Sequence, residues 1–101
     1  MPTAVVHHAR VAWDFAQQAV AVAGDTVDRF EWFQSKLGWI LGPDSEQELA
    51  DTRARLVSHP RPDIRSVEIG RWRVRIEDLL NRRPDLAAQI ADLRLAARRA
   101  A

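Results

Sequence analysis

The residues of this chain most suited to chemistry are its three histidines, because imidazole can bind a metal or transfer a proton near neutral pH. His7 and His8 are adjacent, and His59 lies in a proline-rich stretch. Adjacent residues of a helix diverge by about 100° around its axis, so His7 and His8 do not chelate one metal together. His59 has no nucleophile in a recognisable motif with it. The histidines therefore predict neither a metal site nor a catalytic site.

Acidic residues occur in close pairs, such as Glu46/Glu48 and Glu77/Asp78, which are typical of helix caps and solvated surface. The chain has no cysteine, which excludes disulfides, thiolate catalysis and cysteine-based zinc or iron–sulfur sites. It also has no glycine-rich phosphate loop, no GxSxG elbow and no HExxH motif. We therefore expect a protein that is not an enzyme, with no catalytic residue, no cofactor and no bound metal.

Three arginines, Arg71, Arg75 and Arg82, fall near one side of a predicted helix. Such a stripe could follow the phosphates of a nucleic acid. However, Glu68 and Asp78 are interleaved on the same side, which favours a solvated helix face crossed by salt bridges. No helix-turn-helix spacing with a polar recognition helix is present. Arginine-dependent binding of nucleic acid is therefore the alternative function.

Two tryptophans give the clearest indication of contact with another molecule. In the predicted helix 25–41, one apolar stripe contains Val27, Phe30, Phe33, Leu37, Ile40 and Leu41. Trp32 and Trp39, seven residues apart, fall nearly opposite this stripe, on the side of Lys36. Either this face packs on a second layer of the same chain, or it meets a partner. Tryptophan is enriched at binding hot spots, and a membrane surface would require more basic residues, so we favour a protein partner.

The elements that position these residues are predicted to be helices separated by glycine or proline. The first spans 4–23, begins after Thr3 as N-cap, and has a very wide apolar arc that indicates a central position in a bundle. The second spans 25–41, with Asp25 as cap, and ends at Gly42-Pro43.

A third helix is predicted from Asp44 or Ser45 to about Val57. Its sequence Ser45-x-x-Glu48 has the form of a capping box, and its few large apolar residues indicate a peripheral helix. A last helix opens at Pro84, a residue favoured at the first helical position.

Residues 63–83 allow two interpretations. As a helix, they carry an apolar stripe formed by Ile69, Trp72, Ile76, Leu79 and Leu80. As strands, 67–69 and 72–76 alternate around Gly70-Arg71, a possible hairpin turn. We favour the helix, because the stripe continues to its end and an isolated hairpin has no sheet to join. The expected fold is an all-α single-domain bundle of four to five helices, and the alternative is an α+β fold with a hairpin at 67–76.

Charge is unevenly distributed along the chain, although the net charge is only +1. Residues 1–51 hold three basic and eight acidic side chains, a net of −5, whereas residues 52–101 hold twelve arginines and six acids, a net of +6. A proline-rich linker at 59–62 is predicted between an acidic N-terminal half and a basic C-terminal half of a single helical domain, 1–101. Either the acidic half folds on the basic half, or the charges drive self-association or binding of an anionic partner.

No uninterrupted apolar run approaches the roughly 20 residues that span a bilayer, and no charged segment precedes an apolar one as in a signal peptide. We therefore expect a cytoplasmic protein with no membrane span. Heavy use of alanine and arginine, with Lys36 as the single lysine, is compatible with a GC-rich bacterial genome.

The run GRWRVRIEDLL at 70–80, followed by RPDLA at 83–87, resembles the C-terminal part of a diffuse group of short actinobacterial all-helical proteins. In that group a W-x-x-R-x-E-x-L-L helix precedes a P-x-L-A helix, and segment 25–42 is similar to its middle helix. The group has no established activity. The resemblance implies a partner or appended module of a larger signalling or effector system.

Together these patterns predict a small helical protein–protein interaction module, an adaptor or scaffold that self-associates or docks on a larger signalling or effector protein. The residues predicted to bind the partner are Trp32, Trp39, Lys36, Arg71, Arg75 and Arg82.

Overall fold

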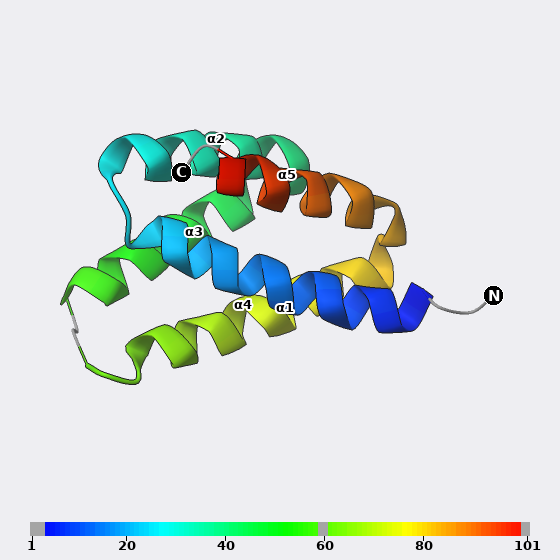
Figure 1. Cartoon of the computed structure of the whole chain (residues 1–101), viewed down its shortest axis with the longest axis horizontal. Helices are drawn as coiled ribbons and strands as arrows, with labels where there is room; N and C mark the ends of the chain where they lie inside the picture. The colour runs from blue at the N-terminus through cyan, green and yellow to red at the C-terminus, as the bar shows by residue number, and fades with distance from the viewer. Residues whose placement is uncertain (1–3, 59–60, 100–101) are drawn as a thin grey trace.

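In the computed structural model the chain forms a bundle of helices joined by short connections (Figure 1). The structure describes residues 4–58 and 61–99, with side chains from residue 8 onward. The helices are α1 (Ala4–Ala23), α2 (Val27–Leu41), α3 (Pro43–Ser58), α4 (Ile64–Arg82) and α5 (Ala87–Arg99), and a 3₁₀ turn at Pro84–Leu86 precedes α5. No strand occurs in the described ranges, so the all-α single-domain bundle is confirmed. The alternative hairpin at 67–76 is wrong, because these residues lie inside α4.

The first helix, α1, is central, as its wide apolar arc predicted. It runs between α4 on one side and α2 and α5 on the other (Figure 1). The fully buried residues along it are mostly small: Ala12, Ala16, Ala19 and Ala23, with Phe15 and Val20 between them. A methyl side chain keeps the backbone of α1 close to the helices that cover it. None of the helices described is long and apolar enough to cross a membrane.

Aromatic rings join α1 to its neighbours. The Phe15 ring of α1 lies 5.7 Å from the Phe33 ring of α2 and 6.3 Å from the Trp72 ring of α4, measured between centroids. All three side chains are fully buried. Aromatic pairs at such separations contribute about 0.5–1.5 kcal/mol beyond the burial of their area. This cluster therefore fixes three helices at one point.

Capping determines where α2 begins and ends. The N-cap is Thr26 and not Asp25, because the Thr26 hydroxyl accepts the Arg29 N–H at 3.3 Å. The Asp25 carboxylate instead accepts the Thr26 N–H at 2.7 Å. At the other end, Gly42 has φ +95°, a conformation open mainly to glycine, and α3 begins directly after it at Pro43. The end of α2 at Gly42-Pro43 was thus predicted correctly, and its N-cap was misplaced by one residue.

The predicted capping box of α3 is wrong, because Ser45 and Glu48 both lie inside the helix and point to other partners. Ser45 is buried and accepts hydrogen bonds from Arg75 of α4. The Glu48 carboxylate forms an ion pair with Arg55. The prediction failed because α3 starts earlier than expected, at Pro43.

Helix α4 follows the predicted period. Trp72, Ile76 and Leu80 are fully buried, whereas Ile69 and Leu79 are half-buried at the edge of the core. Residues 61–63 lead into α4, and His59 and Pro60 of the predicted linker lie outside the described residues.

Candidate interaction surfaces

The structure separates the six residues predicted to bind a partner into two groups. One group, Trp32, Lys36 and Trp39, lies on α2, and the other, Arg71, Arg75 and Arg82, lies on α4. Two of the α2 residues line a groove against α5, whereas the arginines line a groove against the start of α3. The six predicted residues therefore lie on two surfaces, not one.

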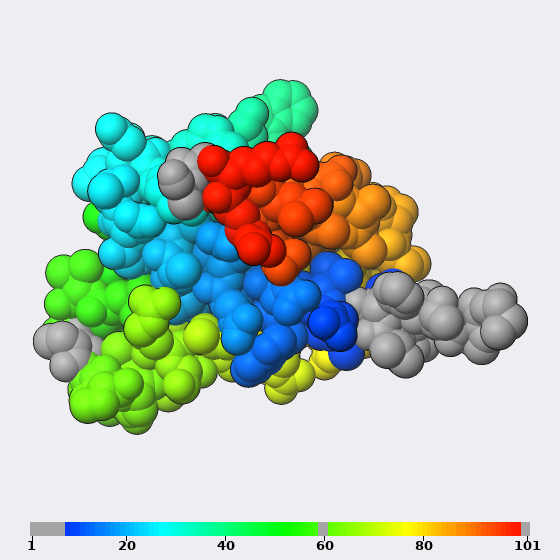
Figure 2. Space-filling view, viewed as in Figure 1, coloured from blue at the N-terminus to red at the C-terminus, as the bar shows by residue number. Residues whose placement is uncertain are grey.

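The first surface is the α2/α5 groove, a hollow of about 300 Å³. Its lining residues are Trp32, Lys36 and Ile40 from α2 and Gln89, Asp92, Leu93 and Ala96 from α5. Figure 2 shows the orange-to-red atoms of α5 lying close to the cyan atoms of α2 on one side of the molecule. The floor of the groove is apolar, and its rim carries one cation, Lys36, and one anion, Asp92.

The two tryptophans of α2 lie in different environments. Trp32 is half-buried, and its ring centroid lies 6.5 Å from that of Phe33, so part of the indole packs on the core of its own chain. Trp39 is 88% exposed, the most exposed large apolar side chain in the described part of the chain. Packing against α5 therefore accounts for part of the burial of Trp32, whereas no described helix covers Trp39.

The predicted core stripe of α2 is largely correct. Phe30, Phe33 and Leu37 are buried, and Ile40 and Leu41 are half-buried against the core. Val27 is 54% exposed, contrary to the prediction, because it is the first residue of the helix and lies beyond the packed region. The face opposite the stripe, on which Trp39 lies, points away from the core.

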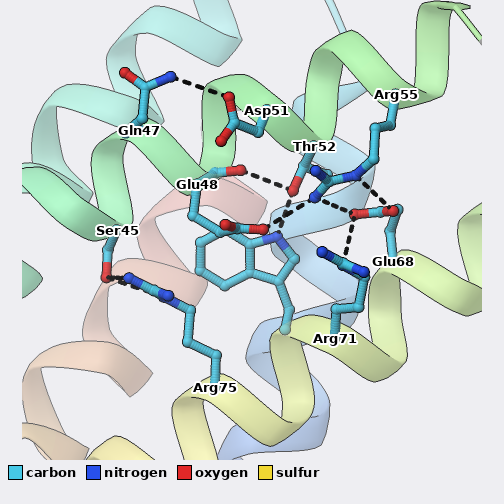
Figure 3. A network of polar contacts seen from close by, with 10 residues as sticks. Ser45, Gln47, Glu48, Asp51, Thr52, Arg55, Glu68, Arg71 and Arg75 are labelled. Atoms are coloured by element: carbon cyan, nitrogen blue, oxygen red, sulfur yellow. Dashed lines mark hydrogen bonds and ion pairs between the residues drawn. The ribbon is translucent and has the colours of Figure 1, made fainter.

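The second surface is the arginine groove, a hollow of about 560 Å³. Its lining residues are Leu41, Asp44, Ser45, Arg71, Val74, Arg75, Asp78, Leu79 and Arg82. Each of its arginines has a polar neighbour within the chain, and two of these contacts are drawn in Figure 3. The two carboxylates in the lining reduce the positive charge that the arginines would otherwise present.

Distances define these arginine contacts. Arg75 donates to the Ser45 hydroxyl oxygen from Nη2 at 3.2 Å and from Nε at 3.4 Å. The Arg71 Nε lies 3.9 Å from a carboxylate oxygen of Glu68, and the Arg82 Nη2 lies 3.4 Å from one of Asp78. The Arg82–Asp78 pair is exposed on both sides and contributes little to stability, so Arg82 remains available to a partner. Arg71 and Arg75 are held by the buried side chains of Glu68 and Ser45.

A partly buried polar network joins α3 to α4 beside the arginine groove (Figure 3). The Arg55 guanidinium donates to both carboxylate oxygens of Glu68, each at 2.9 Å, and to Glu48 at 2.9 Å. Hydrogen bonds to Glu68 are the main reason that the pKa of Arg55 is raised above its ordinary value, although partial desolvation acts in the opposite direction. The Glu68 side chain is 2% exposed, so its carboxylate serves to hold α3 and α4 together.

The same interface holds a hydrogen-bonded indole. The Trp72 Nε1–H donates to the Thr52 hydroxyl oxygen at 2.8 Å, and the Thr52 hydroxyl donates to the Glu48 carbonyl at 2.9 Å. Neither this contact nor the burial of Glu68 was predicted. The available signal was the i, i+4 row of α4, Ile64-Glu68-Trp72-Ile76-Leu80, in which one acid occupies an otherwise apolar line.

The two oppositely charged halves of the chain are joined by few ion pairs. Of the ion pairs found in the described ranges, one, between Glu48 and Arg55, connects residues 1–51 to residues 52–101. Arg53 instead donates to the backbone carbonyls of Ala23 and Asp25, at 3.0 and 2.9 Å. Ion pairs among the described residues therefore do little to join the two halves.

No group of three or more histidine, aspartate or glutamate side chains close enough to hold a metal ion occurs among the residues that the structure describes. His8 is half-buried on α1, and the side chains of His7 and His59 lie outside the described residues. Comparison with protein-family models, curated proteins and solved structures finds no match for this chain.

Proposed function

We propose that this chain is a small helical protein-interaction module that uses the outward face of α2 and the neighbouring α2/α5 groove to bind a protein partner. The observation that carries the proposal is the 88% exposure of Trp39. An indole buries about 150–250 Å² when it is covered, so leaving one in water sacrifices a large hydrophobic contribution. Tryptophan is also among the residues most enriched at binding hot spots.

The surroundings of Trp39 support the same proposal. The α2/α5 groove combines apolar residues, such as Ile40 and Leu93, with a polar rim that includes Lys36 and Asp92. An apolar centre within a polar rim is the usual composition of a protein interface. The resemblance of segments 25–42 and 70–87 to short actinobacterial helical proteins supports docking on a larger signalling or effector protein.

A matched pair of variants tests the proposal. Trp39→Ala removes the proposed anchor, and Trp13→Ala removes another exposed indole, 45% exposed, from α1. Both variants should keep the helical circular dichroism of the wild type. Truncating a tryptophan anchor often costs about 2 kcal/mol or more of binding free energy, so Trp39→Ala should lose binding about 30-fold.

The measurement is affinity capture from a lysate of the organism that encodes the chain, followed by identification and titration of the captured protein. A discrete protein bound by the wild type and by Trp13→Ala, but not by Trp39→Ala, would support the proposal. Equal capture by all three chains would contradict the proposal, because the indole would then not be the anchor. Unfolding of Trp39→Ala would also contradict it, because the indole would then be needed for the fold.

A second candidate function is arginine-dependent binding of nucleic acid. The observation that favours it is that Arg71, Arg75 and Arg82 line one groove. Two carboxylates in the same lining, Asp44 and Asp78, weaken it, since they would repel phosphates.

Retention on DNA or RNA columns tests this alternative. If it holds, retention falls with added salt and disappears when all three groove arginines are changed to alanine. The control is a triple Arg94/Arg98/Arg99→Ala variant, which removes the same charge from α5. Loss of retention in both variants would indicate only nonspecific attraction by net charge.

A further inference from the structure

Four residues on the outward face of α2 lie along one line of the helix, away from the residues that form the core. Asp28, Trp32, Ser35 and Trp39 follow one another at intervals of four, three and four residues. Alternating intervals of four and three place residues along one line of a helix, and this is the pattern by which two helices pack lengthwise against each other. We call this line of four residues the α2 seam.

The α2 seam faces away from the core of its own chain. Phe30, Phe33 and Leu37, on the opposite side of the helix, are buried. Within the seam, Asp28, Ser35 and Trp39 are exposed and Trp32 is half-buried. The seam therefore has the periodicity of a helix–helix contact and no helix of this chain over most of it.

We infer that the partner of the α2 seam is a second copy of this chain, packed antiparallel through α2; this inference rests on the proposed interaction function. A two-fold axis between Ser35 and Lys36 brings Trp39 of each copy opposite Trp32 of the other. Each projecting indole then meets the half-buried indole beside the α2/α5 groove of its partner. Both sides of such a contact are the same surface, as in most homodimers.

The shape of the surface agrees with this arrangement. Ser35, a small residue, lies next to the axis and allows the two helices to approach closely. The α2/α5 groove, at about 300 Å³, is large enough to accept one indole. Antiparallel packing also places the positive end of each helix dipole beside the negative end of the other, which parallel packing would not do.

Charge favours a second copy over a strongly charged partner. The rim of the groove carries Lys36 on α2 and Asp92 on α5, both exposed. A rim with one cation and one anion carries no net charge, whereas a strongly acidic or basic partner would meet a like charge on one wall. The net charge of +1 adds little repulsion between copies.

The contact area indicates a weak dimer. Helix α2 has 15 residues and is therefore about 22 Å long. Two such faces, with an indole contributing about 150–250 Å² at each end, bury less than the ~1,200–2,000 Å² of a stable interface. We expect a weak dimer, with a dissociation constant in the micromolar range or above.

Sedimentation equilibrium over a concentration range that spans this dissociation constant measures the assembly. The wild type should pass from one copy to two, Trp13→Ala should do the same, and Trp39→Ala should remain a monomer at every concentration. High salt should leave the dimer intact, because its contact is mainly apolar. Dissociation by salt would instead indicate head-to-tail pairing of the charged halves and would overturn the inference.

Disulfide trapping tests the orientation, and the absence of cysteine from the chain makes it unambiguous. Ser35→Cys lies beside the axis, within the short Cα separation that a disulfide needs, so oxidation should give a covalent dimer. In Asp28→Cys, the two cysteines lie at opposite ends of the antiparallel pair and should not cross-link. Cross-linking of both variants would show parallel packing and would overturn the antiparallel arrangement. Cross-linking of neither variant, together with a monomeric wild type, would overturn the dimer itself. In that last case, the capture experiment still tests the proposed function, because Trp39-dependent binding of a different protein would support it without a dimer.

Discussion

Replacing Thr52 by valine removes one hydroxyl from a fully buried site and leaves the indole N–H of Trp72 without its acceptor. The two side chains meet at 2.8 Å between Oγ1 and Nε1, and both are 0% exposed. Valine has nearly the shape of threonine, so the substitution changes hydrogen bonding with little change in packing. The perturbation is therefore almost purely polar.

The expected loss follows from the cost of an unpaired buried donor, which is about 1–3 kcal/mol. The second hydrogen bond of Thr52, to the Glu48 carbonyl at 2.9 Å, adds little, because that carbonyl can also accept a bond within α3. Threonine and valine have similar helix propensities, so the backbone contributes almost nothing. We expect the free energy of unfolding to fall by about 1–3 kcal/mol, a large share of the ~5–15 kcal/mol typical of a domain.

Urea denaturation followed by circular dichroism measures this difference, and three further variants separate its causes: Thr52→Ser, Trp72→Phe and Thr52→Val/Trp72→Phe. Thr52→Ser keeps the hydroxyl and loses only a methyl group, which should cost about 0.5–1.5 kcal/mol. In the double variant Thr52→Val/Trp72→Phe no donor remains unpaired, so its loss should be smaller than the sum of the single losses by at least ~0.5 kcal/mol. If Thr52→Val stays within ~0.5 kcal/mol of the wild type, or the two losses simply add, the hydrogen bond does not stabilise the α3–α4 contact and the reasoning is wrong.

Three further predictions concern the backbone and the surface. A Cβ at Gly70, inside α4, would meet no atom within 4 Å, so Gly70→Ala should raise the free energy of unfolding by about 0.5–1 kcal/mol; a loss in urea titration would contradict this. Gly42→Ala should instead lower it by about 1–3 kcal/mol in the same assay, because φ is +95° there, and an unchanged midpoint would contradict that assignment. Hydrogen bonds from Arg83 hold the pKa of Asp85 below its ordinary 3.8, so the stabilisation from this pair is present above that pH and is lost as the pH falls through the lower folded-state pKa. Carboxyl carbon shifts in NMR should show this low pKa in the wild type and a return toward 3.8 in Arg83→Gln, and identical titrations would refute the pairing.

Much of the fold could be predicted because hydrophobic period, glycine and proline act locally. Gly42-Pro43 ends one helix and starts the next, and the row from Trp72 to Leu80 fixes α4 as a helix. The failures are also local. Asp25 and Thr26 are both good capping residues at adjacent positions, and only the backbone geometry decides that the Thr26 hydroxyl makes the capping bond.

The surfaces were predictable only in part, because exposure depends on contacts between distant segments. Trp32 and Trp39 lie on one face of α2 and are equivalent by helical period, yet packing of α5 covers part of only the first. The partners of the arginines are similarly distant: Arg75 reaches Ser45, 30 residues away, and Arg55 reaches Glu68, 13 residues away. No pattern within one helix specifies which of several arginines turns inward to such a partner.

The position of α1 against α4 has a consequence for biosynthesis. The apolar face of α1 leaves the ribosome before α2 and α3, but α4, which packs against α1, leaves it only after them. At about 5–20 residues per second, translation keeps this face uncovered for roughly several seconds. This part of the core therefore closes only after α4 has emerged, and until then the nascent chain carries an apolar helix that chaperones can bind.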